Sequence, residues 1–73
     1  MNKNIAILQP CIIIFQMQTG TGKQIFNRNI DILIKYDTTT EDLYNIAYNK
    51  ISEQYGQDII ILNVVKIKRE YDR

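Results

Sequence analysis

The stretch TTTEDLYNIAYNKISEQYG, residues 38–56, decides the fold, because it carries both start and stop signals of a helix and has β-like runs on either side. At its start are two Thr-x-x-acid pairs, Thr38 with Glu41 and Thr39 with Asp42. Either pair fits a capping box, in which each side chain binds a backbone N–H that the first helical turn leaves unsatisfied. The acids also lie at the positive end of the helix dipole, where negative charge is stabilising.

The stop signal is Gly56, which can adopt the left-handed conformation that ends a helix. Since neither Pro nor Gly interrupts the segment before it, we predict a helix over residues 39–55. At about 100° per residue, one apolar stripe forms along this helix and should face a sheet; it consists of Leu43, Ile46, Ala47 and Ile51. Three tyrosines flank the stripe and form either the rim of the core or a secondary candidate interface: Tyr44, Tyr48 and Tyr55.

The runs before and after the helix have the composition of strands. Residues 11–18, CIIIFQMQ, are apolar and β-branched, and the TGTGK at 19–23 supplies the glycines that a tight hairpin turn requires. Residues 24–36 alternate between apolar and polar positions, as a half-buried antiparallel strand does, and residues 58–69 form the last strand. Residues 5–8 are apolar and give a short fourth strand or remain outside the sheet.

The expected order is strand, strand, helix, strand, in a single α+β domain that covers residues 1–73. If the helix returns the chain across one face of the sheet, the third strand lies beside the first, and the sheet is antiparallel with order 2-1-3. The alternative order, 1-2-3, suits Pro10 better but needs a parallel pair, because Pro cannot donate to a sheet ladder and favours an edge or a strand start. We prefer 2-1-3, with Pro10 at the beginning of the first strand.

Length, charge and cysteine count limit the classes of function. A chain of 73 residues with a net charge of +1 has room for one domain and no strong field to attract nucleic acid or a membrane surface. Cys11 is the only cysteine, which excludes a disulfide within the chain and fits a reducing compartment. Neither a signal peptide nor a transmembrane run is recognisable. We therefore expect a cytoplasmic protein without membrane association.

The sequence contains few of the residues and motifs that catalysis and ligand binding require. The chain has no His, the commonest general acid or base, and Cys11 lies in an apolar run without a neighbouring base. TGTGK is similar to part of a phosphate-binding loop, but Met17 occupies the first glycine position and Gln24 stands where Ser or Thr should follow Lys23. We expect no catalytic residue, no metal site, no cofactor and no small-molecule substrate.

The face of the sheet turned away from the helix is more apolar than solvent exposure favours, since a sheet covered on one side is usually polar on the other. Strict alternation places six apolar side chains there, and these form the candidate protein interface: Ile12, Ile14, Leu33, Ile60, Leu62 and Val64. It also places Lys66 and Lys68 on this outer face. The helix-facing positions of the last strand are then Ile59, Ile61, Asn63, Val65 and Ile67.

A contiguous exposed apolar patch on a small domain marks an interface, so a protein partner or self-association is expected. The alternatives are that residues 5–8 fold over the patch or that both strands twist partly out of water. Fifteen isoleucines against two valines, with many Asn, Lys and Tyr, correspond to A/T-rich codons and suggest an A/T-rich bacterial, phage or mobile-element genome. We therefore expect a non-enzymatic interaction module, such as a phage or mobile-element accessory protein that binds or inhibits a host protein complex, as a monomer or a homodimer.

The alternative function is a nucleic-acid-binding or ribonucleoprotein-associated protein. Positive charge is concentrated at the C-terminal end, and the candidate contacts are Lys66, Lys68, Arg69 and Arg73. Affinity that rests on such phosphate contacts falls steeply as salt concentration rises.

Overall fold

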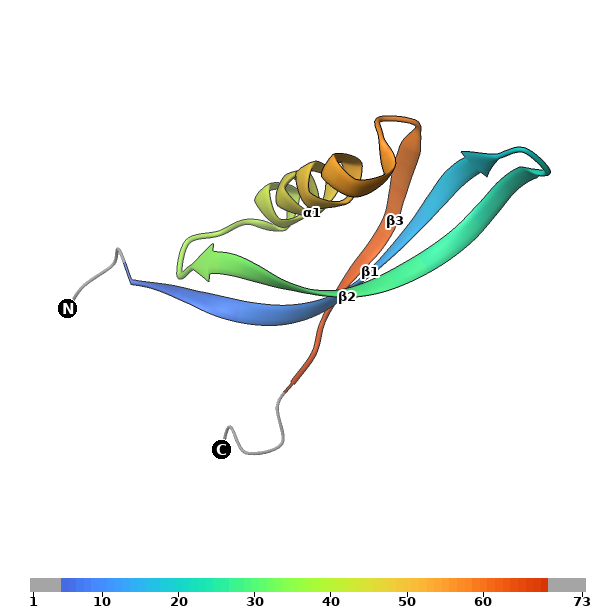
Figure 1. Cartoon of the computed structure of the whole chain (residues 1–73). Helices are drawn as coiled ribbons and strands as arrows, with labels where there is room; N and C mark the ends of the chain where they lie inside the picture. The colour runs from blue at the N-terminus through green and yellow to red at the C-terminus, as the bar shows by residue number, and fades with distance from the viewer. Residues whose placement is uncertain (1–4, 69–73) are drawn as a thin grey trace.

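The computed structural model describes residues 5–68. Its elements are β1 (Ala6–Thr19), β2 (Gly22–Lys35), α1 (Thr40–Tyr55) and β3 (Ile59–Lys66). The strands form one open antiparallel sheet in the order β2-β1-β3, and α1 lies on one side of it (Figure 1). The chain is therefore a small α+β domain with a three-stranded antiparallel sheet and one helix.

The hairpin of β1 and β2 is longer at its N-terminal end than the sequence suggested. β1 begins at Ala6, so residues 6–8 of the apolar run at 5–8 extend the first strand instead of forming a separate one. Pro10 lies within β1, opposite Asp31 of β2, and its placement at the beginning of the strand was wrong. The Pro10 carbonyl accepts the Ile67 N–H at 2.9 Å, so its backbone faces away from β2 and the β1–β2 ladder does not need the N–H that Pro lacks.

The core lies between the sheet and α1. Its central residue is Phe15, whose ring centroid is 5.8 Å from that of Phe26 in β2 and 5.5 Å from that of Tyr55 in α1. Three of the four residues of the predicted helical stripe are buried, and Ile46 packs against the core while half-buried. The buried core as a whole consists of Cys11, Ile13, Phe15, Ile32, Leu43, Ala47, Ile51 and Ile59.

The start of α1 shows which of the two Thr-x-x-acid pairs caps the helix. Thr39 is the N-cap residue: its Oγ1 accepts the Asp42 N–H at 3.0 Å, and the Asp42 carboxylate accepts the Thr39 N–H at 3.2 Å. Thr38 instead binds the end of β2, where its Oγ1 accepts the Lys35 N–H at 2.8 Å and its own N–H donates to the Lys35 carbonyl at 3.1 Å. Gly56 ends the helix with φ 89°, which favours glycine.

β3 contains a β-bulge. Ile14 and Phe15 are consecutive in β1, but their partners in β3, Asn63 and Ile61, are not consecutive. Leu62 is therefore an extra residue in β3, and two of its residues oppose one residue of β1 at this point. Such an insertion inverts the relation between residue number and sheet face for the rest of the strand.

The bulge reverses several assignments made from alternation. Val64 lies opposite the buried Ile13 and packs against the core, whereas Val65 lies opposite Ile12 and is 41% exposed. Since paired residues of antiparallel strands share a face, Val64 faces the helix and Val65 faces outward. Lys66 lies opposite a buried residue of β1 and is likewise on the helix side. The assignments of Val64 and Lys66 to the outer face, and of Val65 to the helix-facing side, were wrong because alternation ignores the extra residue.

Candidate interface on the outer face of the sheet

The surface of β1 and β3 that faces away from α1 carries five neighbouring apolar side chains. Ile60, Leu62 and Val65 are 55%, 45% and 41% exposed, and the two isoleucines beside them in β1 are half-buried. We call this surface the outer-face patch, defined by Ile12, Ile14, Ile60, Leu62 and Val65. Four of these residues were predicted from the sequence, and none of the described elements covers them.

Val65 is the residue of the patch that strict alternation did not predict. The sequence nevertheless contains an indication of its true position, which is the neighbouring Asn63. Alternation put Asn63 on the helix-facing side, where an amide side chain has no place in an apolar core. A bulge one residue earlier moves Asn63 to the outer face and Val65 with it, and it brings Val64 inward instead. A polar residue in the wrong phase of an otherwise apolar strand was thus the indication of the bulge.

Leu33, the remaining predicted residue, lies apart from the patch. It faces outward from β2, opposite Leu8 of β1, and the two side chains are 57% and 54% exposed. The part of β1 that pairs with β3 runs only from Cys11 to Met17, so this leucine pair lies on the two-stranded end of the hairpin. Asp31 and Pro10 separate it from the outer-face patch.

The tyrosines of the secondary candidate interface bind different parts of the sheet. The Tyr44 hydroxyl donates to Asn63 Oδ1 at 2.9 Å and accepts the Val64 N–H at 3.3 Å, so it covers the free edge of β3 beside the bulge. The Tyr48 hydroxyl donates to the Gln57 carbonyl at 3.2 Å, in the link between α1 and β3. Both side chains are half-buried, and both hydroxyls form hydrogen bonds within the domain.

Tyr55 points toward the opposite side of the sheet. Its ring packs on Phe15, its hydroxyl accepts from Arg28 Nε, and the Arg28 guanidinium carbon lies 5.4 Å from the ring centroid. The end of α1 is thereby attached to β2. The three tyrosines therefore do not form one continuous contact surface.

Replacing Tyr44 by Phe should lower the free energy of unfolding by about 1 kcal/mol, because a hydroxyl that bridges the helix to the edge of β3 is lost while the ring remains. Urea denaturation followed by circular dichroism measures this change. Tyr36→Phe is the matched control, since Tyr36 is 75% exposed and the same atom is removed. Equal stabilities of the two variants would contradict the role given to the Tyr44 hydroxyl.

Cys11 is a buried thiol of the core. Its side chain is 0% exposed, and Sγ lies 3.5 Å from the Gln9 carbonyl, to which it donates. Burial raises the pKa of the Cys11 thiol, an effect that the charge of Lys66 partly opposes and that of Asp31 reinforces. Because the thiolate is the reactive form, these surroundings favour an inert structural cysteine.

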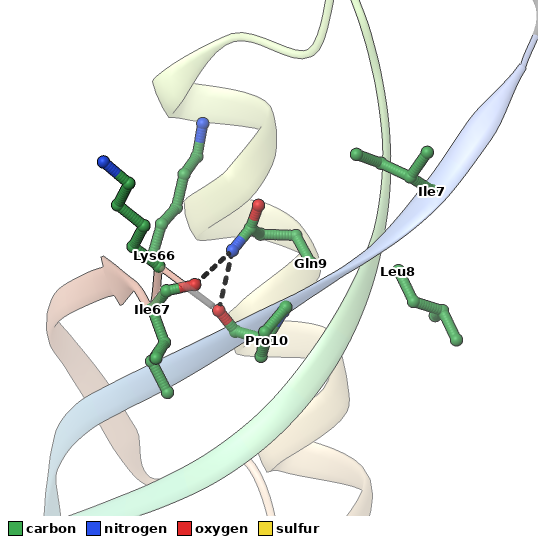
Figure 2. Close-up of a pocket in the computed structure, with 7 residues that line it drawn as sticks. Ile7, Leu8, Gln9, Pro10, Lys66 and Ile67 are labelled. Atoms are coloured by element: carbon green, nitrogen blue, oxygen red, sulfur yellow. Dashed lines mark hydrogen bonds between the residues drawn. The ribbon is translucent and has the colours of Figure 1, made fainter. Parts of the chain in front are cut away.

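The basic C-terminal end is only partly described. Lys66 and Lys68 line a hollow of about 400 Å³ together with the β1 segment 7–10 (Figure 2). Gln9 Nε2 donates to the carbonyls of Pro10 and Ile67 at 3.0 and 3.1 Å and fixes one wall of this hollow. The other two predicted nucleic-acid contacts, Arg69 and Arg73, lie outside the described residues.

Within residues 5–68, no group of three or more His, Cys, Asp or Glu side chains is arranged to hold a metal ion. No helix in the same part of the chain is long and apolar enough to cross a membrane. Comparison of the chain with protein-family models, with curated proteins and with solved structures gives no match.

Proposed function

We propose that this protein is a non-enzymatic interaction module that binds another protein through the outer-face patch. The observation that carries the proposal is the exposed apolar surface of β1 and β3, which no described element covers. On the outer face, the β2 residues opposite Ile14, Ile12 and Pro10 are polar, namely Asn27, Asn29 and Asp31. An apolar centre with a polar rim is the usual anatomy of a protein interface.

The rigid backbone of β1 that carries Ile12 and Ile14 favours tight binding. Ile12 and Ile14 alternate along β1 with Ile13 and Phe15, which are fully buried in the core. Their backbone is therefore fixed by packing on the helix side and by ladders on both edges. A surface held in one conformation loses little conformational entropy on binding, so more of the burial energy remains as affinity.

The biological setting that we propose is that of a phage or mobile-element accessory protein that binds or inhibits a host protein complex. Its support is compositional: the small size of the chain and its excess of residues with A/T-rich codons. The outer-face patch fits this setting, because a rigid apolar surface on a small domain can bind in a groove of a larger protein complex.

Ile60→Lys should abolish capture of the protein partner from a lysate of the source cells, with at least a tenfold loss of affinity once the partner is purified. The substitution places a charge in the outer-face patch, at the end where Ile60 lies opposite Gln16, and this charge must be desolvated on binding. Circular dichroism should show an unchanged fold, since Ile60 is 55% exposed.

Asn49→Lys is the matched control, because it adds the same charge to an exposed position of α1. It should capture the partner as the wild type does. Loss of capture in both variants would contradict the patch and indicate a general effect of charge. Capture that disappears after nuclease treatment would instead support binding through the basic C-terminal end.

A further inference from the structure

The two edges of the sheet are protected very differently. The outer edge of β3 carries the bulge at Leu62 and is partly covered by the Tyr44 hydroxyl. The outer edge of β2 has neither feature: β2 pairs with β1 over fourteen consecutive positions without a register shift and contains no Pro. Among residues 5–68, no strand pairs with this outer edge of β2. Natural proteins usually protect so long an edge, because its free N–H and C=O groups are a template for another strand.

The residues that present these groups can be identified. In an antiparallel pair, successive residues turn their backbone groups alternately toward the partner strand and away from it. The N–H and C=O of Lys35 both bind Thr38, so Lys35 faces away from β1. The odd-numbered residues from 23 to 33 therefore present their N–H and C=O groups at the free edge. Their side chains lie on the outer face, because the even-numbered Ile32 is buried under the helix.

The outer-face side chains of β2 form a chemical palindrome. In order they are Lys23, Ile25, Asn27, Asn29, Asp31, Leu33 and Lys35. From either end the series runs cation, aliphatic, short polar side chain, and then the central Asn29. In a two-fold pairing of this strand, each position meets the position equally far on the other side of the axis. The palindrome therefore places aliphatic side chains opposite aliphatic ones and polar side chains opposite polar ones.

We propose that two copies of this chain pair antiparallel along β2, with Asn29 opposite Asn29 of the second copy. The result is a continuous six-stranded sheet held by roughly ten backbone hydrogen bonds, two for each of five hydrogen-bonded pairs. Ile25, which is 66% exposed, then lies opposite Leu33 of the second copy, which is 57% exposed, so each side chain covers part of the other's exposed apolar surface. Asn27 lies opposite Asp31 and can donate to its carboxylate.

Other registers match the side chains less well. Centring the pair on Asp31 places two carboxylates against each other, and centring it on Arg28 does the same with two guanidinium groups. Centring it on Asn27 pairs Ile25 with Asn29 and leaves Leu33 opposite the hairpin turn. The register centred on Asn29 brings like charges together only for Lys23 and Lys35, at the exposed ends. Salt screens this repulsion, so the dimer should become tighter as ionic strength rises.

The proposal deepens the proposed function, since it rests on this chain being an interaction module and identifies a second copy as one of its partners. It uses the β2 edge, whereas the outer-face patch lies on β1 and β3. Both surfaces can therefore be occupied at once, and a dimer would present two patches on one face of the extended sheet.

Cysteine cross-linking tests the register. Asn29→Cys should form a disulfide-linked dimer under mild oxidation, because residues opposite each other in a hydrogen-bonded pair have Cα atoms about 5.5 Å apart, within disulfide reach. Asn27→Cys is the matched control, exposed on the same face, and its two copies would lie roughly 13 Å apart. The native Cys11 is buried and does not compete. Cross-linking of Asn27→Cys that equals or exceeds that of Asn29→Cys would overturn the register.

Sedimentation equilibrium tests the association itself. The wild type should be a dimer, and Asn29→Pro should raise its dissociation constant at least tenfold, because this N–H faces the free edge and its loss leaves the β1–β2 ladder intact. The control is Asn49→Lys, which changes an exposed residue of α1 far from the β2 edge and should remain folded and dimeric. A proline at position 49 is not used as the control because it would break α1. A wild-type chain that is monomeric at millimolar concentration would overturn the proposal.

Measuring both dimerisation and partner capture for each variant distinguishes the β2 edge from the outer-face patch. If Asn29→Pro leaves partner capture unchanged and the wild type is monomeric, the edge proposal fails and the outer-face patch stands. If the dimer is present and Ile60→Lys has no effect on partner capture, the patch fails and the edge proposal stands.

Discussion

Phe15→Ala should leave little folded protein at 25 °C. Phe15 is fully buried, and its ring lies between those of Phe26 and Tyr55, which come from β2 and α1. Truncating a buried Phe to Ala typically costs about 3–5 kcal/mol, because apolar contact is lost and a cavity remains. A domain of this size has a total stability of roughly 4–11 kcal/mol, at about 0.05–0.15 kcal/mol per residue. A domain this small buries a limited share of its surface and lies toward the lower end of that range, where the loss is comparable to the whole stability.

The measurement is urea denaturation followed by far-ultraviolet circular dichroism, starting from the signal of the variant without urea. Phe26→Ala is the matched control, since the same ring is removed from a half-buried position of the edge strand β2. It should cost about half as much as Phe15→Ala. Equal losses would mean that the ring of Phe15 does not hold the three elements together.

The helix could be predicted from the sequence because its signals are local. A Thr at the N-cap, an acid three residues later and a Gly at the end each act on groups within one helical turn. The structure has α1 at Thr40–Tyr55, with Thr39 and Asp42 in the capping box. The sequence could not choose between this box and that of Thr38 with Glu41, since the choice depends on contacts of Thr38 with the end of β2.

The N-terminal extent of β1 could not be predicted, because Pro10 resembles a boundary when its partner strands are unknown. A missing N–H breaks a ladder only if it faces a strand that needs it. Here the backbone of Pro10 faces the side of β3, and β2 pairs with β1 through and beyond this residue. The direction in which the Pro10 backbone faces thus decides whether the first strand begins at residue 11 or at Ala6.

The candidate site was predictable only up to the bulge. In β3 the face of each residue before Leu62 follows from alternation, and Ile60 lies on the outer face as expected. Beyond it, the faces depend on which β1 residue each β3 residue meets, a long-range property that the run IIILNVV does not contain. Asn63 was the local indication of the bulge, because its amide is favourable outside the core, where its Oδ1 accepts from the Tyr44 hydroxyl.

Val64→Asp and Val65→Asp should therefore have opposite consequences from those that strict alternation predicts. Val64 packs against the core opposite Ile13, so an aspartate there loses apolar contact and must hold a charge near buried side chains. We expect a loss of roughly 3 kcal/mol in the free energy of unfolding. Val65 is 41% exposed on the outer face, where the same substitution should cost only about 0.5–1 kcal/mol, mainly from strand propensity.

Urea denaturation of the two variants measures the difference, and the pair is its own control because the residues are adjacent and lose the same side chain. Without the bulge, Val65 would face the helix and Val65→Asp would be the damaging change. A larger loss for Val65→Asp would thus contradict the bulge at Leu62, and with it the composition of the outer-face patch. If the bulge holds, Val65→Asp remains folded while carrying a charge inside the patch, so it should lose the protein partner as Ile60→Lys does. Agreement between these two variants, one on each side of Leu62, would tie the corrected strand register directly to the proposed binding surface.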